Sequence, residues 1–372
     1  MSWHRRDLIG ALGAAALVPL VGTRLYADEP ALPRLRDAAA ARGIAFGASS
    51  DIAITEAPPA YQALFAAQCA QLAPNLSWAT VSRGPGVYDF STAQANLDFA
   101  AAQAMPLTGA HLLWHERLPR WVAELADPTA IRQAMLDHIA FMGARFAGRV
   151  RAWNVVNEAI RPEDGRADGL RDEPLLRALG LDYIDLAFRA ARASDPKALL
   201  VYNDYGLELD RPDHAARRDA MLSLLDALQR RGAPIGAVGL QSHLRLDDMA
   251  RFDERLYRRF LAELAGRGLP ILITELDVLD IGAPADVARR DGMVAAAYAR
   301  FLDVALDERA VTSVVTWGLS DRYTWLTPES GEQFARADRL PARPLPFDAD
   351  FAPKPAFTAL LGAFGRAPAP RA

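Results

Sequence analysis

The sequence predicts a single (β/α)8 barrel, and three observations support this fold class. Short apolar runs alternate with longer amphipathic stretches along the chain, which is the alternation of strands and helices in a parallel sheet. Eight such units follow one another, the number that closes a barrel of this type. Polar or aromatic residues follow the apolar runs, where the strands of a barrel end on the face that carries catalytic groups.

The runs predicted as strands are rich in Val, Ile, Leu and Ala, and Gly or Pro often stands just before them. They cover residues 44–48, 76–80, 106–111, 152–156, 198–202, 235–240, 270–274 and 312–316. Helical spacing of apolar residues predicts helices that include 131–146, 175–193, 215–231, 249–266 and 286–307. A doubly wound open sheet is the alternative fold, but no Gly-rich phosphate turn follows the first run.

Composition excludes several classes of protein. The 372 residues are 51% hydrophobic and 24% charged, which are ordinary values for a globular chain and argue against disorder or a fibre. The net charge of −4 argues against a nucleic-acid groove, which needs clustered Lys and Arg. One Cys excludes an internal disulfide, and the six His lack the spacing of a zinc hydrolase. We therefore predict no metal and no cofactor.

Residues 1–27 are predicted to be an export signal. Arg5 and Arg6 precede an apolar run over 8–22, which is short for a membrane span and resembles a twin-arginine signal. An amphipathic or anchoring helix is the alternative. We expect a catalytic barrel over 28–366 and a flexible tail over 367–372. The mature chain is expected to be an exported monomer, periplasmic or secreted, without a membrane segment.

Two carboxylates at predicted strand ends point to a type of chemistry. Glu158 and Glu275 each end an apolar run, where a single Glu often serves only to stabilise the start of the next helix. Two of them in one barrel match glycoside hydrolysis, which needs one acid to protonate the leaving oxygen and one carboxylate to attack or stabilise the sugar cation. Paired carboxylates also occur in metal sites, which need further oxygen or nitrogen ligands close by. They occur in aspartic proteases as well, but those enzymes use a pair of Asp residues on another fold.

Other residues near these strand ends suit sugar chemistry. Asn157 precedes Glu158 and is suited to bonding a sugar hydroxyl. His243 and Asp277 are suited to a relay that keeps Glu275 ionised, although a structural hydrogen-bonded pair is the alternative. Flat faces for sugar C–H groups come from Trp78, Trp114, Trp317 and Trp325, for which packing at the barrel top is the alternative.

Several longer strings of residues carry a resemblance. They are FGAS from Phe46, LLWH ending at His115, WNVVNE ending at Glu158, YNDY from Tyr202, GLQSHL from Gly239, ITELDV from Ile273, WGLSDRYTWL from Trp317 and PLPFDADFAPKPAF from Pro344. In these strings and their order, nearly the whole mature chain resembles the family 10 glycoside hydrolases, mostly endo-β-1,4-xylanases. The resemblance implies a (β/α)8 barrel and a retaining double displacement.

The resemblance also implies roles for particular residues. It makes Glu158 the general acid/base, Glu275 the nucleophile, and His243 and Asp277 the pair that tunes the nucleophile. The remaining matched positions contact the sugar: His115, Asn157, Gln241 and Trp317 next to the scissile bond, and Asn203 and Tyr205 on the leaving-group side. The implied partner is xylan or a xylo-oligosaccharide. The same chemistry on another β-glycan or an aryl β-glycoside is an alternative, as is a non-catalytic saccharide-binding protein.

One stretch departs from the family pattern. Family members usually carry PENxxKW at the end of the second strand, whose Glu, Asn and Lys hold sugars on the non-reducing side. Ala73, Pro74 and Ser77 stand at those positions here, while Trp78 is kept. Asn75 and Ser77 offer neutral hydrogen bonds, which are weaker than those of a charged Lys. We therefore expect an altered grip on the substrate and favour short or decorated xylo-oligosaccharides.

Overall fold

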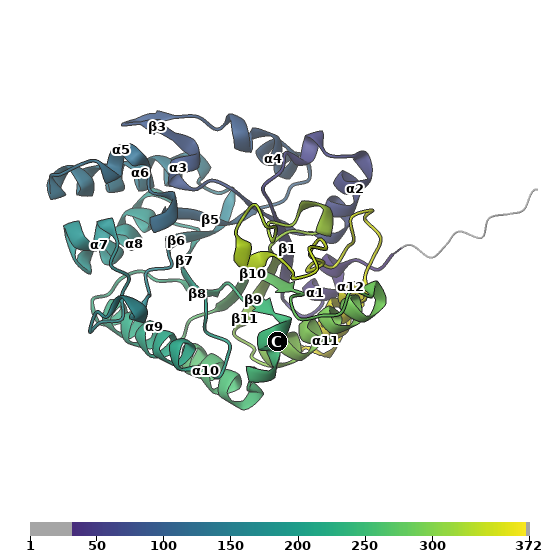
Figure 1. Cartoon of the computed structure of the whole chain (residues 1–372). Coiled ribbons are helices and arrows are strands. Elements are labelled where there is room, and N and C mark those ends of the chain that lie inside the picture. Colours follow the sequence, from purple (N-terminus) through teal and green to yellow (C-terminus); the bar gives the residue numbers. More distant parts are fainter. Residues whose placement is uncertain (1–31, 370–372) are drawn as a thin grey trace, which may run out of the picture. The chain divides into compact units, whose positions relative to one another are not determined.

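The computed structural model describes residues 32–369, and these residues contain a closed (β/α)8 barrel (Figure 1). Its parallel strands follow the order β11-β1-β2-β5-β6-β7-β8-β10, and pairing of β10 with β11 closes the ring. The predicted fold class is confirmed, and the open-sheet alternative is wrong. The predicted export signal over 1–27 lies outside the described residues.

The barrel strands are short, as expected for this fold. They are β1 Ala45–Ser50, β2 Gln71–Pro74, β5 Leu107–Trp114, β6 Val150–Asn157, β7 Leu199–Asp204, β8 Ala237–Leu240, β10 Ile271–Leu279 and β11 Val311–Thr316. Outside the ring, β3 Ser82–Gly84 pairs with β4 Val87–Tyr88, and β9 His243–Arg245 runs parallel to the outer half of β10.

Helices surround the ring of strands (Figure 1). The α-helices are α1 Leu35–Ala40, α2 Pro59–Gln68, α3 Trp78–Val81, α4 Ser91–Ala102, α5 Arg120–Ala123, α6 Pro128–Phe146, α7 Pro174–Leu179, α8 Asp182–Ser194, α9 Pro212–Arg230, α10 Glu254–Gly266, α11 Val287–Ala305 and α12 Pro355–Arg366. Short 3-10 turns are η1 Ile54–Glu56, η2 His115–Arg117, η3 Pro162–Asp164, η4 Leu246–Arg251, η5 Asp321–Tyr323 and η6 Glu332–Phe334. Within residues 32–369, no helix combines the length and apolarity needed to cross a bilayer.

The predicted second strand was wrong. Residues 76–80 are not a strand, because Trp78 begins the helical turn α3, and the strand of this unit is β2, which ends at Pro74. The hydrophobic pattern missed β2 because it is short and begins with a polar residue. The Gln71 side chain lies inside the barrel, where it donates to Ser313 Oγ at 2.7 Å and to Ala45 O at 3.2 Å.

The predicted helix over 175–193 is two helices. Gly180 interrupts it with φ of 64°, a left-handed conformation that glycine adopts without the steric cost of a side chain. The first helix, α7, begins at a cap in which the Glu173 carboxylate accepts from the backbone N–H groups of Leu175 and Leu176. After this break α7 contacts α6, whereas α8 packs against α6, β6 and β7.

Two layers of apolar packing support the strands. Inside the barrel, Ala152, Val201, Ala237 and Leu272 from four neighbouring strands form a small buried cluster. Between the strands and the helices lies a much larger core, which includes Phe46, Tyr257 and Phe301. Strands β6 and β10 are buried almost throughout, since one face meets the barrel interior and the other meets the helices. The residues at their carboxyl ends therefore rest on a rigid base.

Candidate active site

The catalytic face brings together most of the predicted site residues. Glu158 directly follows β6, Asn203 lies near the end of β7, Gln241 directly follows β8, His243 begins β9, and Glu275 lies within β10. The side chains of Asn203, Gln241 and His243 form hydrogen bonds that reach one or the other of the two glutamates. The predicted ring of strand-end groups is therefore one connected site.

Glu158 has an unusual backbone conformation. Its φ is 58°, in the left-handed region that costs a residue with a side chain about 1–2 kcal/mol. Its N–H donates to Asn203 O at 2.9 Å, and its carbonyl accepts from Arg171 Nε at 2.7 Å. These two bonds hold the residue in the strained conformation and fix the direction of its carboxyl group.

The surroundings of the Glu158 carboxyl favour its protonated form. The residue is 8% exposed, and Oε1 accepts from Gln241 Nε2 at 3.0 Å and from Asn157 Nδ2 at 3.2 Å. Burial raises the pKa of Glu158, and the negative charge of Glu275 adds to this, outweighing the opposing bond from Gln241. A carboxyl group that keeps its proton is suited to general acid catalysis.

The surroundings of Glu275 have the opposite effect. Oε1 accepts from Asn203 Nδ2 at 2.8 Å, and Oε2 lies 3.3 Å from His243 Nε2. His111 Nε2 lies 3.5 Å from Oε1, which is long for a hydrogen bond. Burial alone would raise the pKa of Glu275, but His111 and His243 outweigh it and lower the pKa to about 2. Glu275 is therefore an anion throughout the ordinary pH range.

His243 and Asp277 form the pair that the sequence suggested. His243 Nδ1 lies 3.0 Å from Asp277 Oδ1, and Trp325 Nε1 donates to Asp277 Oδ2 at 2.8 Å. Burial alone would lower the pKa of His243, but the charges and hydrogen bonds of Asp277 and Glu275 raise it to about 10. The imidazolium therefore stays beside Glu275 and stabilises its negative charge.

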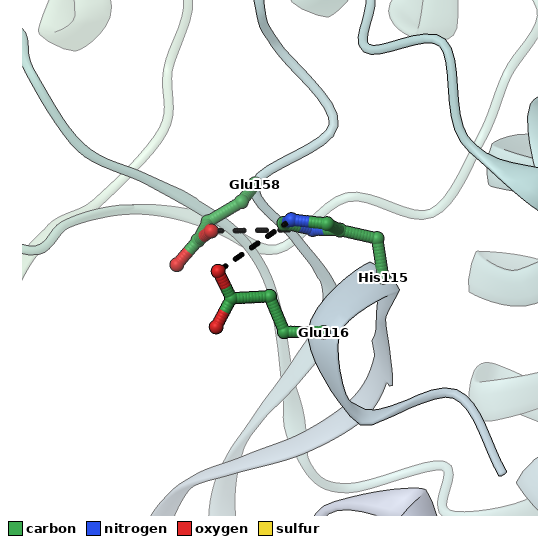
Figure 2. Close-up of side chains that lie close together, drawn as sticks. All are labelled: His115, Glu116 and Glu158. Carbon is green, nitrogen blue, oxygen red and sulfur yellow. Dashed lines mark ion pairs between the residues drawn. The ribbon is translucent and has the colours of Figure 1, made fainter. Parts of the chain in front are cut away.

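The side chain of His115 lies close to those of Glu116 and Glu158 (Figure 2). His115 Nδ1 is 4.0 Å from Glu158 Oε2, and His115 Nε2 is 3.9 Å from Glu116 Oε1. Burial and the positive charges of Arg171 and Arg161 lower the pKa of His115 to about 4. A neutral imidazole at this position adds no charge that would remove the proton from Glu158.

The same three side chains offer oxygen and nitrogen ligands close enough together to hold a metal ion. The nearby guanidinium groups oppose a cation there, because Arg171 Nη2 lies 3.9 Å from Glu158 Oε2 and both Arg171 and Arg161 place positive charge around His115. We therefore assign the cluster to control of protonation at Glu158.

Asn203 connects the two halves of the site. Its Nδ2 donates both to Glu275 Oε1 and to Asn157 Oδ1, each at 2.8 Å, while Thr274 Oγ1 donates to its Oδ1 at 2.7 Å. Asn203 is fully buried, so it orients other side chains. The resemblance in sequence placed it on the leaving-group side of the site, and it does not reach that side here. Gly239 on the next strand allows this placement, because a Cβ there would lie 2.2 Å from Asn203 Oδ1.

The predicted aromatic residues fall into two groups. Trp317 and Trp325 are partly exposed, and the imidazole of His243 lies 6.4 Å and 5.1 Å from their rings, measured between centroids. They border the site, as does Trp114 beside His115. Trp78 is only 2% exposed and stacks on His138 at 4.5 Å, so its faces are occupied by protein and it supports the site through packing.

The second-strand stretch lacks the charged groups of the family pattern. Ala73 and Ser77 are 3% and 2% exposed, and the Ser77 hydroxyl donates to Asn75 Oδ1 at 3.0 Å. Thr80 Oγ1 also donates to Asn75 Oδ1, at 3.2 Å. Ser77 and Thr80 therefore orient Asn75, whose side chain in turn bonds that of Asp51 at the mouth of the barrel. The charged lysine of the family pattern has no counterpart at position 77.

Two residues of the site were missed in the sequence. His111 faces Glu275 from within β5, and its position among the apolar residues of the predicted strand 106–111 was the available signal. Arg171 lies in the loop before α7, where many charged residues occur and no spacing sets it apart. Its Nη2 also donates to the hydroxyl of Tyr205 at 3.1 Å, so it links the acid to the end of β7.

The fold and the site together define a class of barrel enzyme in which a protonated acid works with an ionised carboxylate. Comparisons with known proteins give the family. The pattern of glycosyl hydrolase family 10 matches residues 34–363. Endo-1,4-beta-xylanase B of Thermotoga neapolitana is 30% identical over 288 residues, which cover 77% of each chain. Endo-1,4-beta-xylanase B of Paenibacillus barcinonensis is 33% identical over 295 residues, covering 74% of this chain and 82% of that one.

Solved structures agree. Native xylanase 10B from Thermotoga maritima superposes with a TM-score of 0.79 at 28% identity, over 89% of this chain and 98% of that one. Xylanase 10B from Thermotoga petrophila, crystallised with xylobiose, gives 0.79 at 27% identity, over 90% and 97%. The chain belongs to glycosyl hydrolase family 10.

Replacing His243 with glutamine tests the tuning of Glu275. The substitution removes a positive charge, so the pKa of Glu275 is expected to rise above its value of about 2. Because only the ionised carboxylate can attack, activity should be lost at a higher pH on the acidic side of the kcat/KM profile, while the alkaline side, set by Glu158, moves less. His214→Gln, outside the site, is the matched control. An unchanged acidic limb would contradict the role given to His243.

Proposed function

We propose that this protein is a retaining glycoside hydrolase that cleaves β-1,4-xylosidic bonds in xylan or xylo-oligosaccharides. One observation carries the proposal: two glutamates at neighbouring points of a single site have opposite pKa shifts, upward at Glu158 and down to about 2 at Glu275. Shifts in these directions favour the ionisation states that a general acid and a nucleophile need at the same pH.

The first half of the reaction uses protonated Glu158 and ionised Glu275. Glu158 donates its proton to the glycosidic oxygen while Glu275 attacks the anomeric carbon, which breaks the glycosidic bond and forms a glycosyl ester with inversion. Asn203 and His243 hold the attacking carboxylate in place through hydrogen bonds to its two oxygens. Asn157, which donates to the acid Glu158 at 3.2 Å, is the residue that we propose to bond a hydroxyl of the bound sugar.

The second half reverses the roles. Once Glu275 is an ester it carries no charge, so the repulsion that helps raise the pKa of Glu158 disappears. Glu158, now ionised, removes a proton from water, and the water oxygen attacks the anomeric carbon and displaces Glu275. The two inversions leave the sugar with its original configuration. We expect the two carboxyl groups to stand about 5–5.5 Å apart, the spacing of retaining enzymes.

The sugar is inferred from relatives and from the second strand. The similar curated proteins are named endo-1,4-beta-xylanases, and one similar structure contains xylobiose. The second strand lacks charged groups for a ligand, since Ala73, Pro74 and Ser77 carry no charge and are also buried. Losing several polar contacts, each worth about 0.5–1.5 kcal/mol, weakens binding on the non-reducing side. We therefore place short or decorated xylo-oligosaccharides ahead of long linear xylan.

Product analysis tests this function. Xylo-oligosaccharides of graded length, labelled at the reducing end, should be cleaved and should first release the β-anomer, as followed by proton NMR. Linear xylan should be cut more slowly per bond than short or decorated oligomers. Release of the α-anomer would contradict the retaining mechanism. A panel cleaved only at cello-oligosaccharides or aryl β-glucosides would favour another β-glycoside, and binding without cleavage would favour a saccharide-binding protein.

We further propose that the protein is exported and acts in the periplasm or outside the cell. Support comes from the sequence alone, through the paired Arg5 and Arg6 and the apolar run over 8–22. Fractionation of cells that express the full chain, compared with an Arg5→Lys, Arg6→Lys variant, tests it. Retention of the native chain in the cytoplasm would contradict the proposal.

A further inference from the structure

A long loop carries two of the tryptophans that border the site, Trp317 and Trp325. The loop covers residues 317–354 between β11 and α12, and its helical turns are η5 and η6. Trp325 donates to Asp277 Oδ2 at 2.8 Å, and its ring centroid lies 5.1 Å from that of the His243 imidazole. The position of this loop therefore decides how well the pair beside the nucleophile is covered.

A buried arginine fastens one stretch of the loop. Most residues from 327 to 340 are exposed, but Arg336 is only 5% exposed. Its guanidinium donates to the carbonyl of Asp280 and, at 2.9 Å, to that of Ala283, both in the chain that directly follows β10. Asp338 accepts from the same guanidinium at 2.9 and 2.7 Å. Arg336 therefore ties the loop to the end of β10, the strand that contains Glu275.

A second arginine holds the same place from α11. Asp280 is fully buried, and its Oδ2 accepts from Arg290 Nε at 2.8 Å and from Arg290 Nη2 at 2.5 Å. Arg336 Nη1 lies 3.5 Å from the same oxygen. Arg290 Nη2 also donates to Pro341 O at 2.6 Å, which holds the end of the stretch. With Asp338, the two arginines face two aspartates, so the charges balance as burial requires.

The fastened stretch supports the indole of Trp325. Phe334, two residues before Arg336, meets Trp325 edge to face, with ring centroids 4.7 Å apart. Both rings pack against a buried apolar cluster that includes Leu279, the last residue of β10. Because Phe334 and Arg336 are so close in the chain, loss of the buried ion pairs would free the ring that holds the indole over Asp277.

Ionisable groups face Glu275 from four other parts of the barrel. They are His111 in β5, His243 in β9, Glu158 after β6 and Asp51 after β1. Burial opposes the shifts of the central pair, but the histidines lower the pKa of Glu275 to about 2, and Asp277 with Glu275 raises the pKa of His243 to about 10. Burial and the charge of Asp277 raise the pKa of Tyr298 in α11, so that group stays neutral. Water admitted beside Trp325 would weaken the charge interactions and return the two shifted pKa values toward their ordinary range.

We propose that Arg336 is a positioning residue, which anchors the loop so that Trp325 stays over the pair that faces Glu275. The inference rests on the proposed function, in which Glu275 is the nucleophile. Arg336 bonds Asp280, Ala283 and Asp338, so it acts through the loop and the indole.

Replacing Arg336 with methionine removes the anchor and keeps a long side chain. The acidic limb of the kcat/KM profile should move upward by about half a pH unit, because water reaches the pair beside Glu275. This shift should disappear in a chain that already carries His243→Gln, since the charge that water would screen is then gone. Arg339→Gln is the matched control and should leave the profile unchanged, because Arg339 lies in the same stretch, is exposed and pairs with Glu332 at 2.7 Å.

Further measurements separate this role from a merely structural one. Thermal unfolding of each variant sets the assay below its melting temperature, and a profile lowered equally at every pH would overturn the proposal. A limb shift of the same size in the His243→Gln chain would overturn it as well. If Arg336→Met does not fold, Phe334→Ala removes the ring beside Trp325 and should give the same shift, and an unchanged limb would overturn the proposal.

If the native chain cleaves no β-xyloside, the proposed function fails, and proton NMR decides the anchor alone. The imidazole signals of His243 are assigned by their loss in His243→Gln and are titrated in the native chain, where its pKa is about 10. A lower pKa of His243 in Arg336→Met, or in Phe334→Ala, supports the proposal. A pKa equal to that of the native chain overturns it.

Discussion

Replacing Glu275 with alanine is expected to lower kcat by roughly five orders of magnitude, because the reaction loses the group that forms its covalent intermediate. Binding of xylo-oligosaccharides should remain measurable, since the other groups that face the sugar are unchanged. Steady-state assays on an aryl β-xyloside, together with titration of an uncleaved oligosaccharide, provide the measurement. The comparison separates an enzyme from a saccharide-binding protein.

Added azide gives a second test of Glu275 as the nucleophile. The alanine variant has space where the carboxylate stood, so azide can attack the anomeric carbon from the same face and should yield the α-glycosyl azide. Glu124→Ala is the matched control, because Glu124 is exposed and pairs with Arg120 outside the site. Turnover close to that of the native protein in Glu275→Ala would remove Glu275 from the role of nucleophile.

Replacing Glu158 with alanine is expected to have an effect that depends on the leaving group. A xylo-oligosaccharide needs its leaving oxygen protonated, so kcat/KM should fall by about 10³–10⁴-fold, near the upper end of what general acid catalysis supplies. A dinitrophenyl xyloside needs no such help, so its first step should stay fast while the second step, which needs a base, becomes slow. A burst of dinitrophenol followed by slow turnover is the expected signature.

Azide again distinguishes the roles. In Glu158→Ala it can attack the glycosyl ester in place of activated water, so turnover of the dinitrophenyl xyloside should rise and the product should be the β-glycosyl azide. The opposite anomers expected from the two variants assign nucleophile and acid independently of any rate. An equal loss of activity on substrates with good and poor leaving groups would contradict the assignment of Glu158 as the acid.

The barrel and its catalytic pair were predictable because both leave a local pattern. A buried parallel strand is apolar on both faces, so β6 and β10 were visible as runs ending in Glu158 and near Glu275. The second strand was not visible, because Gln71 enters the barrel interior and satisfies its amide with Ser313, far away in the sequence. Pairing between distant residues cannot be read from local hydrophobicity.

The burial and protonation of the site residues were less predictable from the sequence than the identity of those residues. Asn203 and Trp78 match positions implied to contact sugar, yet both are buried, and burial depends on neighbours that come from other strands. The neutral state of His115 depends on Arg171 and Arg161, which the sequence places more than 45 residues later. Tertiary proximity, more than residue type, therefore decides which groups touch a ligand and which carry a proton.

The close approach of Gly239 to Asn203 has a consequence for how this enzyme can change. Any side chain at position 239 would displace the Asn203 amide, which bonds both Asn157 and Glu275. Few substitutions at this position would therefore be compatible with activity. The residues that depart from the family pattern, Ala73, Pro74 and Ser77, belong to β2 and the turn after it and are not among the partners in those bonds. Variation that diversifies substrate choice can therefore accumulate at the rim while the reaction chemistry is inherited unchanged.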